Sequence, residues 1–166
     1  MSETFHHISK LCDRLYFGKY PCVKTMEELE PLGITHFIDC VSNGEYIFRN
    51  IKEYSLPEQI TRIHFPIEDM GIEDDVEVTK FIDELLEILF DNPRNRIYIH
   101  CYGGHGRSAT IAGILYGKLL GIPYNQVIDI VRSSHRQRKT LRREWRYNGA
   151  ISSDSQEKQL KRLLEK

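Results

Sequence analysis

A strand pattern, a glycine-rich turn and a helical pattern follow one another between residues 96 and 120. The stretch "RIYIHC" at its start is rich in β-branched and aromatic residues, which is typical of a central strand. Three glycines follow in "YGGHG", and from about Arg107 apolar residues recur at helical spacing. These apolar residues are Ile111, Ile114, Leu115 and Leu119. A strand that turns tightly into a helix is the repeating unit of α/β folds, so this stretch favours that class.

The rest of the chain continues the alternation. Further strands are expected over residues 14–20, 34–40 and 62–67. Further helices are expected over residues 24–33, 75–90, 125–134 and 155–164. The residues predicted to share the buried face of the second of these helices are Val78, Phe81, Leu85 and Leu89. We therefore expect an α/β fold with a single, mostly parallel central sheet flanked by helices, as one domain over residues 1–166.

Two helix starts carry sequence signals. Thr25 and Glu28 predict a capping box for the helix over residues 24–33, and Gly33 predicts its end. Asp74 predicts the N-cap of the helix that follows the acidic loop.

Length and composition favour a globular domain. The chain has 166 residues, 40% of them hydrophobic, which is enough to bury a core. No apolar run approaches the ~20 residues of a membrane span, and "MSETFHHISK" lacks the pattern of a secretion signal. The 4 cysteines are scattered, which argues against a disulfide framework or a zinc site. We expect a cytoplasmic or nuclear protein with reduced thiols and no metal or other cofactor.

Charge is divided unevenly along the chain, although the net charge is only −1. Residues 1–100 contain 10 Lys and Arg against 19 Asp and Glu, whereas residues 101–166 contain 13 against 5. Solvated charged faces are the commonest cause of such a division. A basic half that contains the glycine-rich turn would also attract an anionic ligand.

The turn itself has the composition of an anion-binding loop. Its glycines allow successive backbone N–H groups to point inward, and the helix N-terminus adds about half a positive charge. Arg107, in the first helical turn, can bind two phosphate oxygens with its planar guanidinium. The same groups favour the thiolate form of Cys101. The turn therefore predicts nucleophilic attack of Cys101 on a phosphate monoester, with a cysteinyl-phosphate intermediate.

Two residues beside this pair have expected supporting roles. Ser108 can donate a hydrogen bond to the departing Cys101 sulfur, although a serine here can also merely cap the helix. His100 is expected to hold the loop through backbone carbonyls rather than to act as a base.

The string His-Cys-x-x-Gly-x-x-Arg-Ser resembles the signature of the cysteine-dependent protein tyrosine phosphatase superfamily, and its small dual-specificity branch in particular. The matching residues are His100, Cys101, Gly104, Arg107 and Ser108. The segments "LYFGKYP" and "GITHFIDC" and the acidic loop ahead of the signature resemble the same branch. The resemblance implies a phosphoric monoester hydrolase of that fold that needs no metal.

The resemblance also implies a general acid. In this family an Asp about thirty residues before the cysteine, after a Pro-aliphatic pair, protonates the leaving oxygen. Asp69 in "FPIED" matches that position, and Gly71 is where its loop would flex. A solvated loop carboxylate is the alternative reading of Asp69. Asp39 and Gln159 also resemble family residues near the pocket, but Gln156 competes with Gln159, and none of these three is placed in the catalytic set.

The remaining loop residues bear on the substrate. The residues expected to contact it are Tyr102, Gly103, Gly104, His105, Gly106 and Arg107. Tyr102, Gly103 and His105 stand where lipid-directed relatives have lysines, and His105 is expected to add only a partial, pH-dependent charge. We therefore expect a phosphorylated protein as substrate, carrying phosphotyrosine and also phosphoserine or phosphothreonine. A phosphoinositide phosphatase, an RNA 5′-phosphate phosphatase and a non-catalytic phosphate-binding module are the alternatives.

A basic segment, "HRQRKTLRREWR", covers residues 135–146. Helical spacing would place its charges in stripes that contact a polyanion. The charges concerned are Arg136, Arg138, Lys139, Arg142 and Arg143, with Arg146 continuing one stripe. A solvated basic helix with Trp145 as a core anchor is the alternative. His6 and His7 are expected to belong to a mobile N-terminus.

Overall fold

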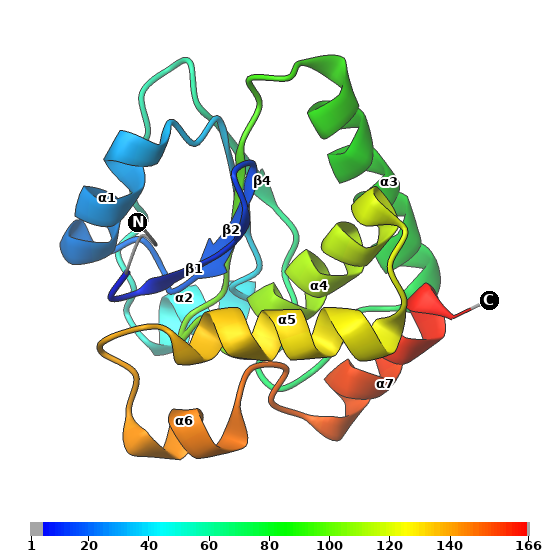
Figure 1. The fold of residues 1–166 in the computed structure, drawn as a ribbon. Coiled ribbons are helices and arrows are strands. Elements are labelled where there is room, and N and C mark those ends of the chain that lie inside the picture. Colours follow the sequence, from blue (N-terminus) through cyan, green and yellow to red (C-terminus); the bar gives the residue numbers. More distant parts are fainter. Residues whose placement is uncertain (1–4, 166) are drawn as a thin grey trace.

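In the computed structural model, which describes residues 5–165 except for the side chain of residue 147, a five-stranded sheet lies between helices (Figure 1). The strands are β1 (Ile8–Cys12), β2 (Leu15–Gly18), β3 (His36–Asp39), β4 (Thr61–His64) and β5 (Ile97–His100). Their order is β1-β2-β5-β3-β4; β1 pairs antiparallel with β2, and every other pair is parallel. The predicted α/β class with a mostly parallel central sheet is confirmed. Strand β1 was not predicted, because its short sequence ISKLC mixes polar and apolar residues without a clear alternation.

Helices cover both faces of the sheet. They are α1 (Val23–Leu29), followed by a 3-10 turn (Glu30–Leu32), α2 (Asn43–Phe48), α3 (Asp75–Asp91), α4 (Arg107–Leu120), α5 (Tyr124–Arg136), α6 (Arg143–Asn148) and α7 (Asp154–Leu164). Helix α1 lies on one side, and α3, α4, α5 and α7 lie on the other (Figure 1). Among the described helices, none has the length and apolar character to cross a membrane.

Side chains of the central strand β5 enter hydrophobic clusters on both faces of the sheet. Ile97 and Ile99 join the cluster on the side of α4, whereas Tyr98 joins the smaller cluster on the side of α1. All three side chains are fully buried. Alternation across a strand with helices on both faces produces this division. The predicted core faces of α3 and α4 are confirmed, except that Leu119 is only partly buried.

The start of α1 differs from the predicted capping box. The helix begins at Val23, with Cys22 as N-cap, so that Thr25 lies inside the helix and is fully buried. Glu28 does not bond back to the helix start. Its carboxylate instead accepts hydrogen bonds from the backbone N–H groups of His6 and His7, at 2.7 and 2.8 Å. The predicted stop at Gly33 is confirmed by its left-handed φ of 68°.

The basic segment is not one helix, so its predicted stripes are wrong. Helix α5 ends at Arg136 and α6 begins at Arg143, with a loop between them. The Arg146 guanidinium donates to the backbone carbonyls of Arg136 and Arg138, at 3.1 and 3.0 Å. These bonds satisfy carbonyls that the broken helix leaves free. Arg138 is buried rather than solvated, so the arginines of this segment have different surroundings.

The register of the sheet decides where the cysteine lies. Gly18 of β2 and Asp39 of β3 both pair with His100, the last residue of β5. The carboxyl ends of these three parallel strands therefore coincide. The loop after β5 leaves the sheet at this edge, which is the usual ligand site of such folds.

Candidate active site

The cysteine loop, residues 101–106, is fixed by close backbone packing. Gly104 has a φ of 77°, and a Cβ atom there would lie only 2.5 Å from the backbone nitrogen of Lys19. A Cβ atom at Gly106 would lie 2.6 Å from Ser152 Oγ. The loop is thus held between the end of β2 and the residues before α7.

Cys101 lies at the base of this loop, with 2% of its surface exposed. Its Sγ accepts a hydrogen bond from the backbone N–H of Gly104 at 3.3 Å and lies 3.3 Å from Ser108 Oγ. Ser108 is fully buried in the first turn of α4. The structure therefore brings the predicted hydroxyl donor against the predicted nucleophile.

Arg107, the first residue of α4, is 3% exposed, and Glu45 on α2 fixes its orientation. Both guanidinium Nη atoms bond to the Glu45 carboxylate, Nη2 to Oε2 at 3.0 Å, and Nη1 also donates to the carbonyl of Ile67 at 2.8 Å. Burial opposes the charge of Arg107, but the bonds to Glu45 outweigh it and raise the pKa of Arg107. Burial also opposes the charge of Glu45 and by itself would raise the pKa of this carboxyl group. The hydrogen bond from Arg107 outweighs that effect, so the pKa of Glu45 is lowered. The pair is ionised, and its bonds through the two Nη atoms leave Nε of the guanidinium without a hydrogen bond to the described residues.

Glu45 is a site residue that the sequence analysis missed. The signal was present in "SNGE", residues 42–45, which has the spacing of a capping box. In the structure Ser42 Oγ accepts from the Glu45 N–H at 3.3 Å, and Glu45 Oε1 accepts from the Ser42 N–H at 3.1 Å. Only the tertiary fold shows that the same carboxylate reaches Arg107.

Asp69 lies at the same site on the loop after β4. Its Oδ1 is 3.3 Å from Arg107 Nη2, and its Oδ2 is 3.4 Å from Arg49 Nη2. The side chain is about half exposed. The following residue, Met70, has a φ of 63°, and the N–H of Gly71 bonds to the carbonyl of Glu68 at 2.9 Å. A tight turn therefore presents the predicted acid to the cavity.

His100 supports the loop from below. It is fully buried, its Nε2 lies 2.8 Å from the Tyr54 hydroxyl, and its Nδ1 lies 3.3 Å from the carbonyl of Cys101. Burial lowers the pKa of His100 to about 4, against the opposing effect of Asp39. The imidazole is neutral at pH 7, in agreement with the expected structural role.

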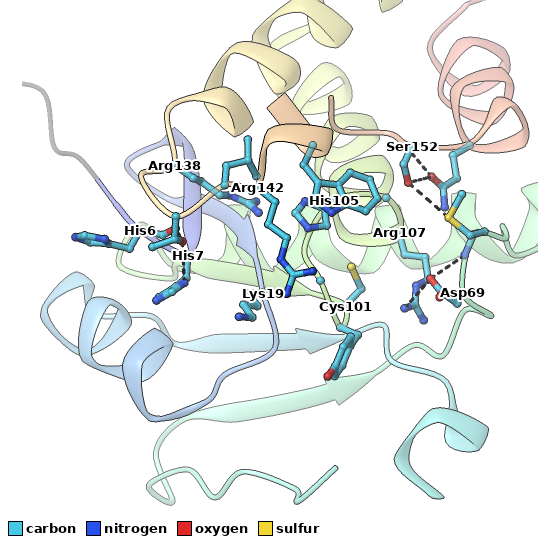
Figure 2. A pocket seen from close by; sticks show the side chains of 18 of the residues that line it. His6, His7, Lys19, Asp69, Cys101, His105, Arg107, Arg138, Arg142 and Ser152 are labelled. Carbon is cyan, nitrogen blue, oxygen red and sulfur yellow. Dashed lines mark hydrogen bonds and ion pairs between the residues drawn. The ribbon is translucent and has the colours of Figure 1, made fainter. Parts of the chain in front are cut away.

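A cavity of about 380 Å³ opens above Cys101 (Figure 2). Of the residues expected to contact a substrate, those that line it are Tyr102, Gly103, His105, Gly106 and Arg107. Gly104 does not line it, because this residue packs behind the loop and directs its N–H to the Cys101 sulfur. Asp69 lines the cavity as well, so nucleophile, guanidinium and acid share one space.

His105 lines the cavity as expected, but the partial, pH-dependent charge predicted for it is wrong. Its Nδ1 lies 2.8 Å from His135 Nε2. Burial, with smaller effects from nearby positive charges, lowers the pKa of His105 to about 3. His105 therefore adds no pH-dependent charge to the pocket near neutrality. It anchors the loop to α5.

Of the two glutamines considered for the cavity rim, hydrogen bonds and the cavity lining distinguish one. Gln156 lines the cavity and donates to the carbonyl of Gly71 at 3.2 Å, whereas Gln159 donates to the carbonyl of Glu73 at 2.7 Å. Gln156 is thus the glutamine at the site.

His6 and His7 were expected in a mobile N-terminus, and in the structure their backbone N–H groups bond to the Glu28 carboxylate. Both histidines line the far end of the cavity.

Comparisons with known proteins agree with this geometry. The family model "Dual specificity phosphatase, catalytic domain" matches residues 15–153. The protein 067L of Invertebrate iridescent virus 3, which bears the name of a tyrosine phosphatase, is 33% identical over 149 residues, covering 83% of this chain and 59% of the relative. Cyclin-dependent kinase inhibitor 3 of Sus scrofa is 34% identical over 113 residues, covering 66% of this chain and 52% of the relative. The chain thus spans little more than half the length of these relatives.

Solved structures show the same fold. A crystal structure of kinase associated phosphatase, with its catalytic cysteine replaced by serine, has a TM-score of 0.70 at 26% identity and covers 96% of this chain and 94% of its own. The active form of Tk-PTP has a TM-score of 0.74 at 21% identity, covering 96% and 97%. On the family match and the viral relative, this chain belongs to the dual specificity phosphatase catalytic-domain family.

Proposed function

We propose that this protein is a cysteine-dependent phosphatase that hydrolyses phosphotyrosine, and also phosphoserine and phosphothreonine, in proteins. One observation carries the proposal: Cys101 Sγ, the Arg107 guanidinium and the Asp69 carboxylate line the same cavity. A pure phosphate-binding module has no need of a nucleophile and an acid together. The tyrosine phosphatase and kinase-inhibitor names of the relatives favour a phosphoprotein as the substrate class.

The free donors of Arg107 define how phosphate binds. Glu45 occupies one hydrogen of Nη2, and Asp69 lies 3.3 Å from the same nitrogen. Nε forms no hydrogen bond with the described residues. A phosphate that binds through Nε and Nη2 displaces the Asp69 carboxylate from Nη2. Asp69 then turns toward the leaving oxygen, which is where an acid is needed.

In the first step the Cys101 thiolate attacks phosphorus, so that a P–S bond forms as the P–O bond to the leaving group breaks. Protonated Asp69 gives its proton to the leaving oxygen. In the second step the Asp69 carboxylate takes a proton from water, whose oxygen attacks phosphorus and breaks the P–S bond. Ser108 donates a hydrogen bond to the departing thiolate, and inorganic phosphate is released. Arg107 and the loop N–H groups stabilise the charge on the transferred group in both steps.

The test is a substrate panel with phosphotyrosine peptides, phosphothreonine peptides, inositol phosphates and 5′-triphosphate RNA. We expect turnover of the peptides, and loss of turnover with retained peptide binding in Cys101→Ser. A clear preference for inositol phosphate or RNA would replace the proposal with one of those activities. Hydrolysis of para-nitrophenyl phosphate at the background rate would favour the binding module. A cytoplasmic location remains a prediction.

A further inference from the structure

Arg49 is a residue of the cavity wall to which the proposed reaction assigns no role. It ends helix α2, where its backbone N–H donates to the carbonyl of Glu45 at 2.8 Å. The next residue, Asn50, turns the chain with a left-handed φ of 51°. The side chain of Arg49 is 33% exposed and lines the cavity that opens above Cys101. The end of α2 therefore places a guanidinium at this wall.

Three neighbours restrict the guanidinium of Arg49. Its Nε lies 3.4 Å from Glu45 Oε2, and its Nη2 donates to Asp69 Oδ2 at 3.4 Å. Its central carbon lies over the ring of Tyr102, 4.2 Å from the ring centre. The three neighbours belong to α2, to the loop after β4 and to the cysteine loop. Two charged contacts and a cation–π contact thus limit a side chain that would otherwise sample many rotamers.

The two oxygens of the Asp69 carboxylate have different partners. Oδ1 lies 3.3 Å from Arg107 Nη2, whereas Oδ2 accepts the hydrogen bond from Arg49. Asp69 and Arg107, which is expected to bind phosphate, lie on the same side of Cys101 (Figure 2). A phosphate bound at Arg107 Nη2 takes the place of Oδ1 and leaves the bond at Oδ2 intact. Of the two guanidinium partners, Arg49 is the one that stays with Asp69 while substrate is bound.

This division also decides which oxygen of Asp69 carries the proton. In a protonated carboxyl group, the oxygen without the proton is the better hydrogen-bond acceptor. The bond from Arg49 therefore favours Oδ2 as the acceptor and leaves the proton on Oδ1. Oδ1 is the oxygen next to Arg107, on the side where phosphate binds.

We propose that Arg49 is the positioning residue of the general acid. It holds Oδ2 of Asp69 after phosphate has displaced Oδ1 from Arg107, so that Oδ1 faces the leaving oxygen. The inference rests on the proposed function and adds a residue to its mechanism. In the first step the proton passes from Oδ1 to the leaving oxygen as the P–O bond breaks, and in the second step Oδ1 takes a proton from the attacking water as the P–S bond breaks. Arg49 keeps its own protons and acts only through Asp69.

The experiment uses a series of aryl phosphates whose leaving groups differ in pKa, with kcat/KM as the readout. Arg49→Met keeps a long side chain and removes every donor to Asp69. We expect kcat/KM to fall by about fivefold for the poorest leaving groups and to stay nearly unchanged for the best. The fall is modest because the ion pair is partly exposed, and it is selective because only poor leaving groups need the proton.

A double-mutant cycle shows whether Arg49 acts through Asp69. In the Asp69→Asn background, Arg49→Met should cause no further fall, because no acid is left to position. Arg162→Met is the matched control. Arg162 also pairs with a carboxylate, that of Asp75 at 2.9 Å, and neither of these two described residues lines the cavity. The control should match the unmutated protein for every leaving group.

Two kinds of result would overturn the role of Arg49 while the phosphatase proposal stands. No fall for any leaving group, or an equal fall for every one, would show that Arg49 does not position the acid; an equal fall would instead assign it to phosphate binding or to the support of Glu45. Additive effects of Arg49→Met and Asp69→Asn would show that the two residues act separately. Inactivity of the unmutated protein toward every aryl and peptide phosphate would instead defeat the proposed function.

Discussion

The indole ring of Trp145 lies flat on the imidazole of His105, with ring centroids 4.0 Å apart and planes within 9° of parallel. Trp145 belongs to α6, whereas His105 belongs to the cysteine loop. The Nδ1 atom of His105 lies 2.8 Å from His135 Nε2, and the carbonyl of His105 accepts a hydrogen bond from the N–H of Ile151 at 2.7 Å. The only tryptophan of the chain therefore covers the loop that carries the nucleophile.

This stack predicts that Trp145 positions the loop. In Trp145→Ala the loss of stacking should lower kcat/KM for a phosphotyrosine peptide by about tenfold, since an aromatic pair contributes up to about 1.5 kcal/mol. Trp145→Phe should retain most of the activity. In the unmutated protein, vanadate binding should change the tryptophan fluorescence, and the same titration in Arg107→Ala should not. Equal activity in the unmutated protein and Trp145→Ala would show that the stack does not matter to the loop.

Glu45 should be as important for stability and activity as the residues of the signature. Glu45→Ala leaves the buried Arg107 without its carboxylate, which should lower the free energy of unfolding by about 3 kcal/mol. Because the guanidinium would no longer be held in one plane, we also expect kcat/KM to fall by roughly 100-fold. Urea unfolding and steady-state kinetics measure the two effects. Glu53→Ala removes an exposed carboxylate and serves as the control, and a similar small effect in both variants would contradict the assigned role.

Gly104 should not tolerate a side chain. Gly104→Ala places a methyl group against the backbone of Lys19 and strains a φ of 77°, so the loop must move. We expect the N–H to Cys101 Sγ contact to be lost and activity to fall by at least about tenfold. Gly44→Ala is the matched control, because nothing lies within 4 Å of a Cβ atom there. Full activity in Gly104→Ala would mean that the contact with the sulfur is dispensable.

Asp69 should act as an acid whose effect depends on the leaving group. Asp69→Asn should reduce kcat on the order of 100-fold for phenyl phosphates with poor leaving groups and much less for good ones. A plot of log kcat against leaving-group pKa should therefore be steeper for the variant. Glu68→Gln, an exposed carboxylate on the same loop, is the control. Parallel plots would assign the proton to another group.

Stability should fall as the pH is lowered from 7 toward 5. Burial lowers the pKa of His100 to about 4 and that of His105 to about 3, below the ordinary value of 6.5. The unfolded chain therefore binds protons below about pH 6.5 that the folded chain does not, and the folded state loses on the order of 1 kcal/mol per pH unit for each such group. Urea unfolding at several pH values measures this slope. His105→Gln should make this slope shallower, because about one proton fewer is then taken up on unfolding. An unchanged slope would show that His105 is not held neutral in the folded state.

The secondary structure around Cys101, and the reactive residues that it carries, could be predicted from the sequence. Strand, glycine turn and helix around Cys101 are encoded by local preferences, because β-branched residues, glycines and helical apolar spacing each restrict the backbone at their own positions. The buried faces of α3 and α4 follow from the same periodicity. The positions of Cys101, Arg107 and Ser108 could be predicted for this reason, since all three belong to one continuous stretch.

Tertiary structure alone decided which distant groups complete the site. Glu45, Trp145 and Arg138 lie on separate elements, and no local pattern states that the first binds Arg107, the second covers His105 and the third is buried beside the cavity. The basic segment shows the reason. Helical spacing describes a single element, whereas the break between α5 and α6 depends on bonds from Arg146 to carbonyls earlier in the segment and from Lys139 N–H to the carbonyl of Phe5. Long-range contacts of this kind override local propensity because burial and hydrogen bonding favour them only after the chain has folded.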